Sequence, residues 1–585
     1  MTAPRSVIGS AAALAAVLGD PAEAVRHDAA LDAAEGFPAE VCARLDGVGF
    51  PALYVPTEWG GALDDHERLL RLWRIVARRD VSALVAHGKT YLGAASVWIA
   101  GSAVQSASTA AAVLSGGQVA WALSEPEHGA DLLNGSVTAA EQDGGYRLDG
   151  VKWPINNATR AGHLVVLART GSAADPRGHS LFLVDKKSLP AGSYRLLPKV
   201  ATHGIRGVDI SGIEFTGAPV PTDALIGPAG TGVETVLRAL QLTRTMCGAL
   251  SLGAGEHALR LVARFTATRI IQRRPLIDRP VPASVLARCA ALLGAAEAAT
   301  FVATRSIHSL TREMSVTSAV VKALVPTLID AVIGDLAELL GARSFLTEAY
   351  EHGAFQKVRR DHQIAAVFDG STPVNRAALI QQFPRLTRDF VAGAFDAAGV
   401  AQAARVGERP GPLDRGALVL LSRQGCSVVQ SLPALAEEIG SQDAPIGLAE
   451  HADALCVVVR HLHGLMAEVR PAARPSIAAY ELASAYELCY AGAACLHLWK
   501  SRERHHRDEP LWRDGLWVRA ALRALLARLA VIVRTVPPSA APGDELIDGR
   551  LAGVVAEAAV SGAVVTAFGA AMPQPSQWTG DCYER

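Results

Sequence analysis

Helical periodicity of the apolar residues dominates the first 117 positions of the chain. The clearest segment is DDHERLLRLWRIVARRD, residues 64–80, where apolar side chains recur at helical spacing and form one continuous face. The Pro- and Gly-containing stretch 56–63 interrupts the pattern and separates two helices. We therefore predict an N-terminal helical domain over residues 1–117. The apolar face of segment 64–80 consists of Leu69, Leu70, Leu72, Trp73, Val76 and Ala77.

The pattern changes near residue 118, where short apolar runs replace the helical spacing. HLVVLART (163–170), HSLFLVDKK (179–187) and SGIEFTG (211–217) have the length and the β-branched or aromatic content of strands. Gly, Pro and Asn are frequent between these runs and predict turns. The sequence therefore predicts a compact β domain over residues 118–229.

Helical patterns return near residue 230, as in the long run 233–271. A Pro- and Gly-rich seam at 408–414 divides this half of the chain, and the segment 537–545 (PPSAAPGDE) predicts a loop before a last helix. We predict one helical domain over 230–390 and an additional helical domain over 391–585. The fold class is mainly α with a central β domain.

Composition excludes several classes of protein. Half of the 585 residues are apolar, which excludes a disordered chain. The 56 Lys and Arg residues balance 57 Asp and Glu residues, so no overall positive charge favours binding to nucleic acid. The eight cysteines contain no C-x-x-C pair, which is typical of reduced thiols in a cytoplasmic protein.

Two apolar segments do not predict membrane insertion. Residues 6–19 are Ala-rich with one preceding Arg, which indicates an N-terminal helix rather than a signal peptide. Residues 557–572 are shorter than the ~20 strongly apolar residues that a membrane span needs. The His-containing segments 460–463 and 504–507 have no Cys or carboxylate at ligand spacing. We interpret them as solvated helix faces and predict no metal site.

Several turn-like segments carry candidate chemistry. These are WALSEPEHGAD (121–131), DGVKWPINNA (149–158), HGIRG (203–207), LIGPAGTG (225–232) and VFDGS (367–371). Each one alone predicts only a turn between strands or helices. In this order and spacing, together with GFPALYVPTEWGG (49–61) and FTATR (265–269), they resemble the acyl-CoA dehydrogenase family over roughly residues 20–390.

The resemblance implies a fold and an activity. It implies a helical bundle, a β-barrel-like middle domain and a four-helix bundle, with FAD bound between them. The implied reaction is α,β-dehydrogenation of an acyl thioester, carried by CoA or by an acyl-carrier protein. The length of 391–585 is similar to the extra helical domain of very-long-chain acyl-CoA dehydrogenases and acyl-CoA oxidases.

The resemblance also implies a catalytic base. The family's commonest branch uses a Glu in a Y-E-G-T segment, and Asp369 stands at that position here. A minority branch uses a Glu directly before an Arg, but Thr243 precedes Arg244 in this chain. We therefore expect Asp369 to be the base, and Arg244 matches an Arg near the acyl-CoA site. An Asp is one methylene shorter than a Glu, so the site differs from that of ordinary family members.

FAD-binding residues follow from the same resemblance. Ser124 matches a hydroxyl at the isoalloxazine edge and Arg269 matches an Arg that binds the FAD pyrophosphate across a subunit boundary. A guanidinium fork suits a pyrophosphate. Pro154 stands where the family has an aromatic residue that shields the flavin. The complete set of expected cofactor-binding residues is Trp121, Leu123, Ser124, Asn156, Arg269, Gly370 and Ser371.

Other functions on the same scaffold remain open. One is an acyl-CoA oxidase or a flavin monooxygenase, and another is a non-catalytic flavoprotein or a scaffold without FAD. The expected electron acceptor is an electron-transfer flavoprotein or oxygen. Because Arg269 would reach the FAD of a neighbour, we expect a homodimer, with a tetramer as the alternative.

Overall fold

The structure is a computed structural model, and its contacts divide the chain into two compact units. The first unit contains Met1–Asp65 and Ile75–Thr243, and the second contains His66–Arg74 and Arg244–Arg585. The four predicted domains are a finer division, and their boundaries stay predictions. The structure describes residues 7–172, 175, 177–441, 444–502, 509–535 and 544–561, without the side chains of residues 22 and 23.

Helices form the N-terminal part of the first unit, as the sequence predicts. Asp80 caps α5 by accepting a hydrogen bond from the Ser82 amide, and Ser102 and Gln105 form a capping box at the start of α6. The apolar face predicted for segment 64–80 is buried in α4. The helices are α1 (Ala11–Leu18), α2 (Pro21–Ala33), α3 (Ala39–Gly47), α5 (Val81–Ala100) and α6 (Ala103–Leu114), while α4 (His66–Arg79) belongs to the second unit up to Arg74.

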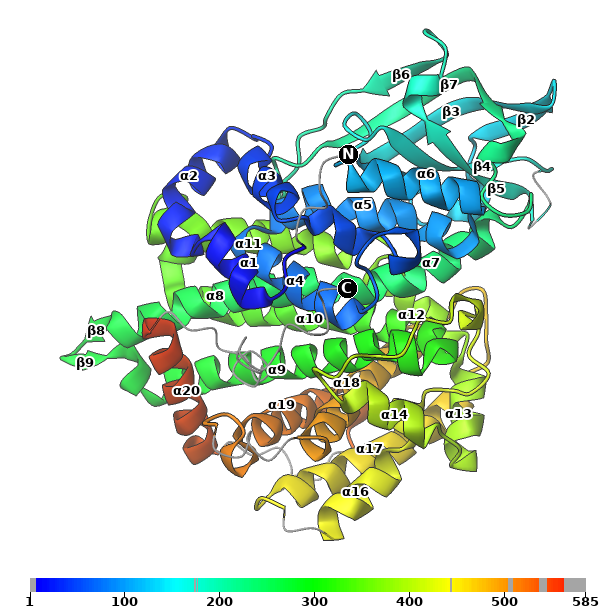
Figure 1. Ribbon diagram of the computed structural model, residues 1–585. Helices are drawn as coiled ribbons and strands as arrows, with labels where there is room; N and C mark the ends of the chain where they lie inside the picture. The colour runs from blue at the N-terminus through cyan, green and yellow to red at the C-terminus, as the bar shows by residue number, and fades with distance from the viewer. Residues whose placement is uncertain are drawn as a thin grey trace. The chain divides into compact units, whose positions relative to one another are not determined.

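A curled seven-stranded sheet forms the rest of the first unit (Figure 1). The strand order is β1-β4-β2-β3-β7-β6, and β5 pairs with β4. β1 runs parallel to β4, whereas β3 and β7 form a long antiparallel pair. The three strands expected from the sequence are confirmed as β4, β5 and part of β7. The strands are β1 (Val119–Ala122), β2 (Thr138–Gln142), β3 (Gly145–Asn156), β4 (His163–Arg169), β5 (His179–Asp185), β6 (Tyr194–Leu197) and β7 (Ile210–Pro221).

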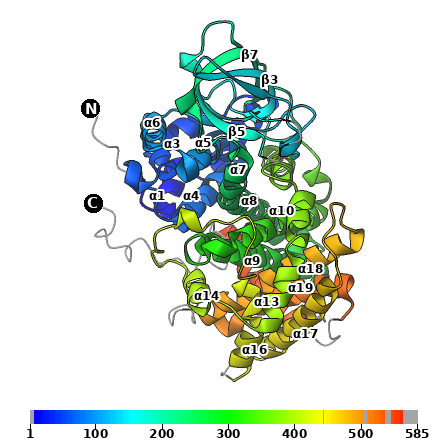
Figure 2. The ribbon, with the colours of Figure 1, turned by 90° about the vertical axis from the view of Figure 1, so that its right-hand side faces the viewer.

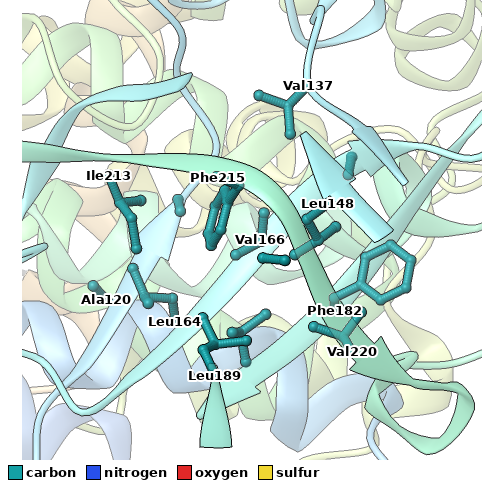
Figure 3. Packing of buried hydrophobic residues seen from close by; sticks show 14 of the residues in the cluster. Ala120, Val137, Leu148, Leu164, Val166, Phe182, Leu189, Ile213, Phe215 and Val220 are labelled. Carbon is teal, nitrogen blue, oxygen red and sulfur yellow. The ribbon is translucent and has the colours of Figure 1, made fainter. Parts of the chain in front are cut away.

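The core of this sheet is built from the inward side chains of its strands. Figure 3 shows Leu148, Val166 and Phe215 gathered among these side chains, and all three are at most 2% exposed. Burial of such side chains is the main favourable term in forming the sheet. The register of β3 against β7 shifts between Lys152 and Ile155, where Pro154 has no N–H for the ladder. Pairing with β7 resumes at Ile155 and Asn156, so the irregularity lies inside the segment 149–158.

Long antiparallel helices form the centre of the second unit. α10 packs against α8, α9 and α12, and Figure 1 shows α8, α9 and α10 side by side. The sequence run 233–271, expected to be helical, is divided at Cys247 into two helices. α7 (Gly232–Met246) belongs to the first unit up to Thr243. The further elements are α8 (Gly248–Thr268), β8 (Ile270–Ile271), β9 (Arg274–Pro275), α9 (Pro280–Ser309), α10 (Met314–Leu340), α11 (Ala354–His362), α12 (Thr372–Ile380) and α13 (Phe383–Ala392).

Further helices complete the second unit. α18 and α19 pack on each other and on α9, and α16 and α17 lie beyond them, as Figure 2 shows. The predicted loop 537–545 lies almost wholly outside the described residues. The helices are α14 (Ala397–Ala404), α15 (Ser427–Gln430), α16 (Leu432–Ser441), α17 (Leu448–Ala467), α18 (Ile477–Lys500), α19 (Leu516–Val533) and α20 (Glu545–Val560).

Burial in these helices corrects one interpretation of the sequence. His463 does not lie on a solvated face: it is 3% exposed and stacks on Phe390 with ring centroids 3.8 Å apart. Burial lowers the pKa of His463 to about 4, so the ring is neutral at physiological pH. The segment 504–507 lies outside the described residues. Seven cysteines are free and buried, as expected, and Cys582 falls outside the described part of the chain.

Two segments of the described chain are long and apolar enough to cross a membrane by length and composition alone. They are Pro280–Ser309 and Thr311–Ser344, and 83% of the apolar window of each is buried inside the fold. A core helix that other helices cover on all sides has this same composition. Their burial therefore favours the interpretation that both are core helices.

Candidate active site

A tight turn carries Asp369 in the second unit. The turn follows the short 3-10 helix Gln363–Ala366 and leads into α12 (Thr372–Ile380). Asp369 and Gly370 both have left-handed backbone conformations, with φ of 56° and 93°. A Cβ atom added to Gly370 would lie 2.8 Å from Arg244 Nη2, so a larger residue there would push the guanidinium away. The sequence Asp-Gly-Ser therefore fits this turn because Asp tolerates and Gly favours this conformation.

Three side chains hold the backbone of this turn. Arg244 Nε donates to the Asp369 carbonyl at 2.9 Å. Lys322 Nζ, on α10, donates to the Gly370 carbonyl at 3.2 Å and to the Ala365 carbonyl at 2.7 Å. Asn375 Nδ2 donates to the carbonyls of Gly370 at 2.8 Å and of Ser371 at 3.0 Å. Because these donors come from three different helices, the turn has little freedom to shift.

The Asp369 carboxylate has its own neighbours. Cys247 Sγ lies 3.6 Å from Asp369 Oδ2, and the thiol is the donor because an ionised carboxylate only accepts. Burial lowers the pKa of Arg244 to about 10, while the nearby charge of Asp369 opposes this shift. Arg244 therefore remains a cation at neutral pH. A carboxylate on a turn that is held in this way has a defined position from which it can accept a proton from a bound molecule.

The candidate flavin-binding residues of the first unit lie around the end of β1. Trp121 is on β1 and pairs in register with Val165 of β4. Leu123 and Ser124 follow directly, and their carbonyls accept hydrogen bonds from Lys152 Nζ at 3.0 Å and from the Trp153 amide at 3.0 Å. These two bonds fix the segment after β1 against β3.

A buried ion pair supports this segment. Lys152 Nζ lies 2.7 Å from Glu125 Oε1, and the two side chains are 1% and 2% exposed. Burial alone would raise the pKa of Glu125, but Lys152 and the hydroxyl and amide of Ser136 outweigh it and hold the pKa at about 2. Glu125 is therefore ionised at neutral pH. Its other bonds reach the amides of Ser136 and Val137, at 2.5 Å and 3.1 Å.

Two buried polar atoms near this segment lack partners among the described residues. Trp121 Nε1 and Asn156 Oδ1 are both shielded from solvent and make no hydrogen bond within the part of the chain that the structure describes. Asn156 Nδ2, by contrast, donates to the Val85 carbonyl at 3.3 Å. Buried polar groups are almost always paired, so orphaned atoms indicate a missing partner. One donor and one acceptor at this position fit a polar, planar ligand such as an isoalloxazine ring.

Comparison with known proteins explains these features. The family model of the acyl-CoA dehydrogenase middle domain matches residues 120–218, and that of the acyl-CoA dehydrogenase C-terminal domain matches residues 230–383. This part of the chain, residues 120–383, belongs to the acyl-CoA dehydrogenase family. Members of this family are oxidoreductases that act on the CH–CH bond of acyl-CoA thioesters.

Relatives support the same assignment. The chain is 26% identical over 358 residues to the probable acyl-CoA dehydrogenase FadE25 of Mycobacterium tuberculosis, covering 61% of this chain and 90% of that protein. It is 27% identical over 347 residues to the human mitochondrial short-chain specific acyl-CoA dehydrogenase, covering 59% and 82%. An acyl-CoA dehydrogenase of Bacillus anthracis, solved as a complex with FAD, has a similar fold. The TM-score is 0.68 at 18% identity, and 89% of each chain is covered.

The site residues predicted from the acyl-CoA dehydrogenase resemblance fall into separate groups. Trp121, Leu123, Ser124 and Asn156 lie together in the first unit, whereas Asp369, Gly370 and Ser371 lie on one turn with Arg244 in the second. Ser371 is the N-cap residue of α12, but its hydroxyl does not cap that helix. The hydroxyl is therefore available to another partner.

Arg269 is far from the turn within the same chain. It ends α8, and Cys247 directly precedes the start of that helix. The 21 residues of α8 span about 30 Å at 1.5 Å per residue. Arg269 is exposed beside the hairpin β8–β9, whose Ile270 is 56% exposed. One chain thus does not bring Arg269 to its own Asp369.

Sequence reasoning missed three residues of the site: Lys322, Asn375 and Cys247. Lys322 could have been noticed in the sequence, because it is a charged residue inside the long apolar helix α10. In the structure it is 1% exposed. A buried Lys needs a partner, and here the partners are backbone carbonyls. Asn375 and Cys247 carried no such signal, because each lies in a segment that is ordinary by composition.

Proposed function

We propose that this protein catalyses the FAD-dependent α,β-dehydrogenation of an acyl thioester, with CoA or an acyl-carrier protein as the thiol. The observation that carries the proposal is the Asp369 turn. A carboxylate stands where the family has its catalytic Glu, beside a cation and on a backbone that Arg244, Lys322 and Asn375 hold in place. Membership of the acyl-CoA dehydrogenase family supports the same reaction class.

The residues of the turn have distinct roles in this proposal. The α-proton of a thioester is only weakly acidic, so its removal needs a base held beside it. Asp369 takes this proton at a carboxylate oxygen. Arg244 keeps the turn in place and balances the charge of the carboxylate, while Lys322 and Asn375 prevent the backbone from moving as the proton arrives.

The cofactor proposal rests on residues that fit FAD. Bound FAD would accept the hydride that leaves the β-carbon. We assign Trp121, Leu123, Ser124 and Asn156 to the flavin ring, because two buried polar atoms of this set lack partners in the described chain. Gly370 and Ser371 would offer backbone and hydroxyl groups, and Arg269 would bind the pyrophosphate of a partner subunit. This last role requires a homodimer or a tetramer.

A second candidate is an oxidase or monooxygenase on the same scaffold. Pro154 favours it, because this exposed residue stands where the resemblance places an aromatic shield over the flavin. A less shielded flavin would admit oxygen more readily. Oxygen would then replace an electron-transfer flavoprotein as the electron acceptor.

The visible spectrum of the purified protein tests the proposal. We expect a yellow protein with non-covalent FAD, whose flavin absorbance bleaches when an acyl-CoA or acyl-carrier thioester from a chain-length panel is added without oxygen. Oxygen consumption with peroxide release during turnover would identify the oxidase instead. A protein that stays colourless after incubation with FAD would contradict both enzymes and favour a scaffold.

A further inference from the structure

The thiol of Cys247 contacts the side chain of the proposed base directly. Cys247 lies between α7 and α8, three positions after Arg244, and is 2% exposed. Its Sγ is 3.6 Å from Asp369 Oδ2, within the range of a hydrogen bond to sulfur. The S–H group is a weak donor, so it orients the carboxylate while leaving most of its negative charge in place.

Both sides of this contact are anchored by other residues. Next to Cys247, a Cβ atom added to Gly248 would lie 2.7 Å from Thr300 Cγ2, so the start of α8 packs closely against α9. Thr300 itself is fully buried. On the other side, Arg244, Lys322 and Asn375 fix the backbone that carries Asp369. The backbone on each side of the contact is therefore held by neighbouring residues.

We propose that Cys247 is a positioning residue that adapts this site to an aspartate base. Its thiol holds Oδ2 of Asp369 and so sets the orientation of the carboxylate that receives the substrate proton. A glutamate at position 369 would extend about one C–C bond, or 1.5 Å, further from the same fixed backbone. Its carboxylate would then meet the thiol. This inference rests on the proposed function, because it assumes that Asp369 is the base.

Infrared spectroscopy tests the contact without any need for substrate or cofactor. The difference between the spectra of the wild type and Cys247→Ala isolates the S–H stretching band of Cys247. The control is Cys289, whose thiol is 3.8 Å from a neutral carbonyl, that of Val332. We expect the Cys247 band at lower frequency than the Cys289 band, because an ionised acceptor forms the stronger bond.

The Asp369→Asn variant tests whether the frequency of the Cys247 S–H band depends on the Asp369 carboxylate. The Cys247 band should move to higher frequency in that variant, while the Cys289 band, isolated with Cys289→Ala, should not move. A Cys247 S–H frequency that stays the same in Asp369→Asn would overturn the proposal. The absence of an S–H band for Cys247 would overturn it as well.

A second-site experiment tests the consequence for the base. Asp369→Glu alone should reduce the rate of flavin reduction by an acyl thioester about 100-fold, since a displacement near 1 Å has this effect. Adding Cys247→Ala to Asp369→Glu should raise the rate of flavin reduction at least tenfold above that of Asp369→Glu alone, because it makes room for the longer side chain. Cys289→Ala in the same Asp369→Glu background should restore nothing. FAD content and thermal midpoint are measured for each variant to show that it is folded.

Failure of this inference is distinct from failure of the proposed function. If the wild type reduces flavin but the double variant is no faster than Asp369→Glu, Cys247 has no positioning role. If no thioester of the panel reduces the flavin of the wild type, the proposed reaction is wrong. The infrared result then decides alone whether the thiol holds the carboxylate.

Discussion

At the scale of single residues, the Glu125–Lys152 pair supports the segment after β1. Two charges that are both nearly inaccessible to solvent stabilise a fold only when each is fully paired. Lys152 meets this condition by bonding both the Glu125 carboxylate and the Leu123 carbonyl. The pair therefore couples the stability of the sheet to the position of the candidate flavin-binding residues.

Lys152→Met should destabilise the first unit strongly. The substitution leaves the Glu125 carboxylate buried without its cation, and breaking such a pair typically costs about 3–5 kcal/mol. Urea unfolding monitored by Trp fluorescence measures the loss. The double variant Glu125→Gln with Lys152→Met is the control, and it should recover much of the stability because no buried charge is left. Equal losses in both variants would contradict the ion-pair account.

At the scale of elements, the sequence patterns predicted regular structure better than they predicted the breaks. The strands at 163–170 and 179–187 appear with nearly the predicted bounds, because a run of apolar and β-branched residues fits few other structures. The helical pattern over 233–271 did not predict the break at Cys247, because no Pro or Gly pair marks it. Periodicity reports which face is buried, whereas this break depends on how α8 packs against α9.

The candidate site follows the same rule: local motifs could be predicted from the sequence, and contacts between distant residues could not. Asp369, Gly370 and Ser371 could be named as candidates because they are adjacent in sequence and match a motif. Lys322 is distant in sequence, and it reaches the turn only through the packing of α10 against the residues around it. A single sequence does not encode such proximity in any local pattern, so the groups that hold the turn needed the structure.

Glu313 makes the C-terminal part of the second unit sensitive to pH. Its carboxyl group bonds the Ser427 amide at 2.7 Å and the Ser427 hydroxyl at 2.5 Å. Burial raises the pKa of Glu313 from 4.5 to about 7, the bonds to Ser427 oppose this shift, and Asp396 and Asp389 add to it. The folded protein thus keeps this proton up to about pH 7, whereas the unfolded chain releases it above about pH 4.5.

The contribution of Glu313 to the free energy of unfolding should therefore fall as pH rises from about 4.5 to about 7, whereas buried His463, with a pKa of about 4, contributes in the opposite direction. Unfolding releases the Glu313 proton in this window, which favours the unfolded state by at most about 3 kcal/mol at pH 7. Guanidinium unfolding at a series of pH values measures the slope. Glu313→Gln cannot titrate at this position, so the difference between the wild-type and Glu313→Gln profiles isolates the falling contribution of Glu313. An unchanged slope in that variant would show that Glu313 is not the group responsible.

At the scale of the whole molecule, the helices beyond residue 383 extend past the matched family models. They contact the helix that follows the candidate base: Arg376 of α12 bonds Glu487 of α18 through two nitrogen–oxygen pairs, each at 2.9 Å. Glu487 is 1% exposed. The C-terminal helices thus contribute to the setting of α12 rather than forming a separate appendage.

The variant Arg269→Ala tests whether this residue binds the FAD of a partner subunit. Its exposed position at the end of α8 suits a contact with a partner subunit's FAD. Arg269→Ala should lower the FAD content of the purified protein, because the pyrophosphate loses a bidentate donor. Light scattering should still report a dimer or tetramer, since one side chain does not hold the subunits together. A wild type that is monomeric at micromolar concentration would contradict this account of Arg269.

The most direct test of the central claim is the rate of flavin reduction in Asp369→Asn. Stopped-flow absorbance records this rate without oxygen, with a thioester that bleaches the wild type. Asparagine keeps the size of the side chain and removes the base, so the rate should fall by about 10²–10⁴-fold while FAD content and thioester binding are retained. An Asp369→Asn variant that reduces its flavin as fast as the wild type would show that Asp369 is only a turn residue.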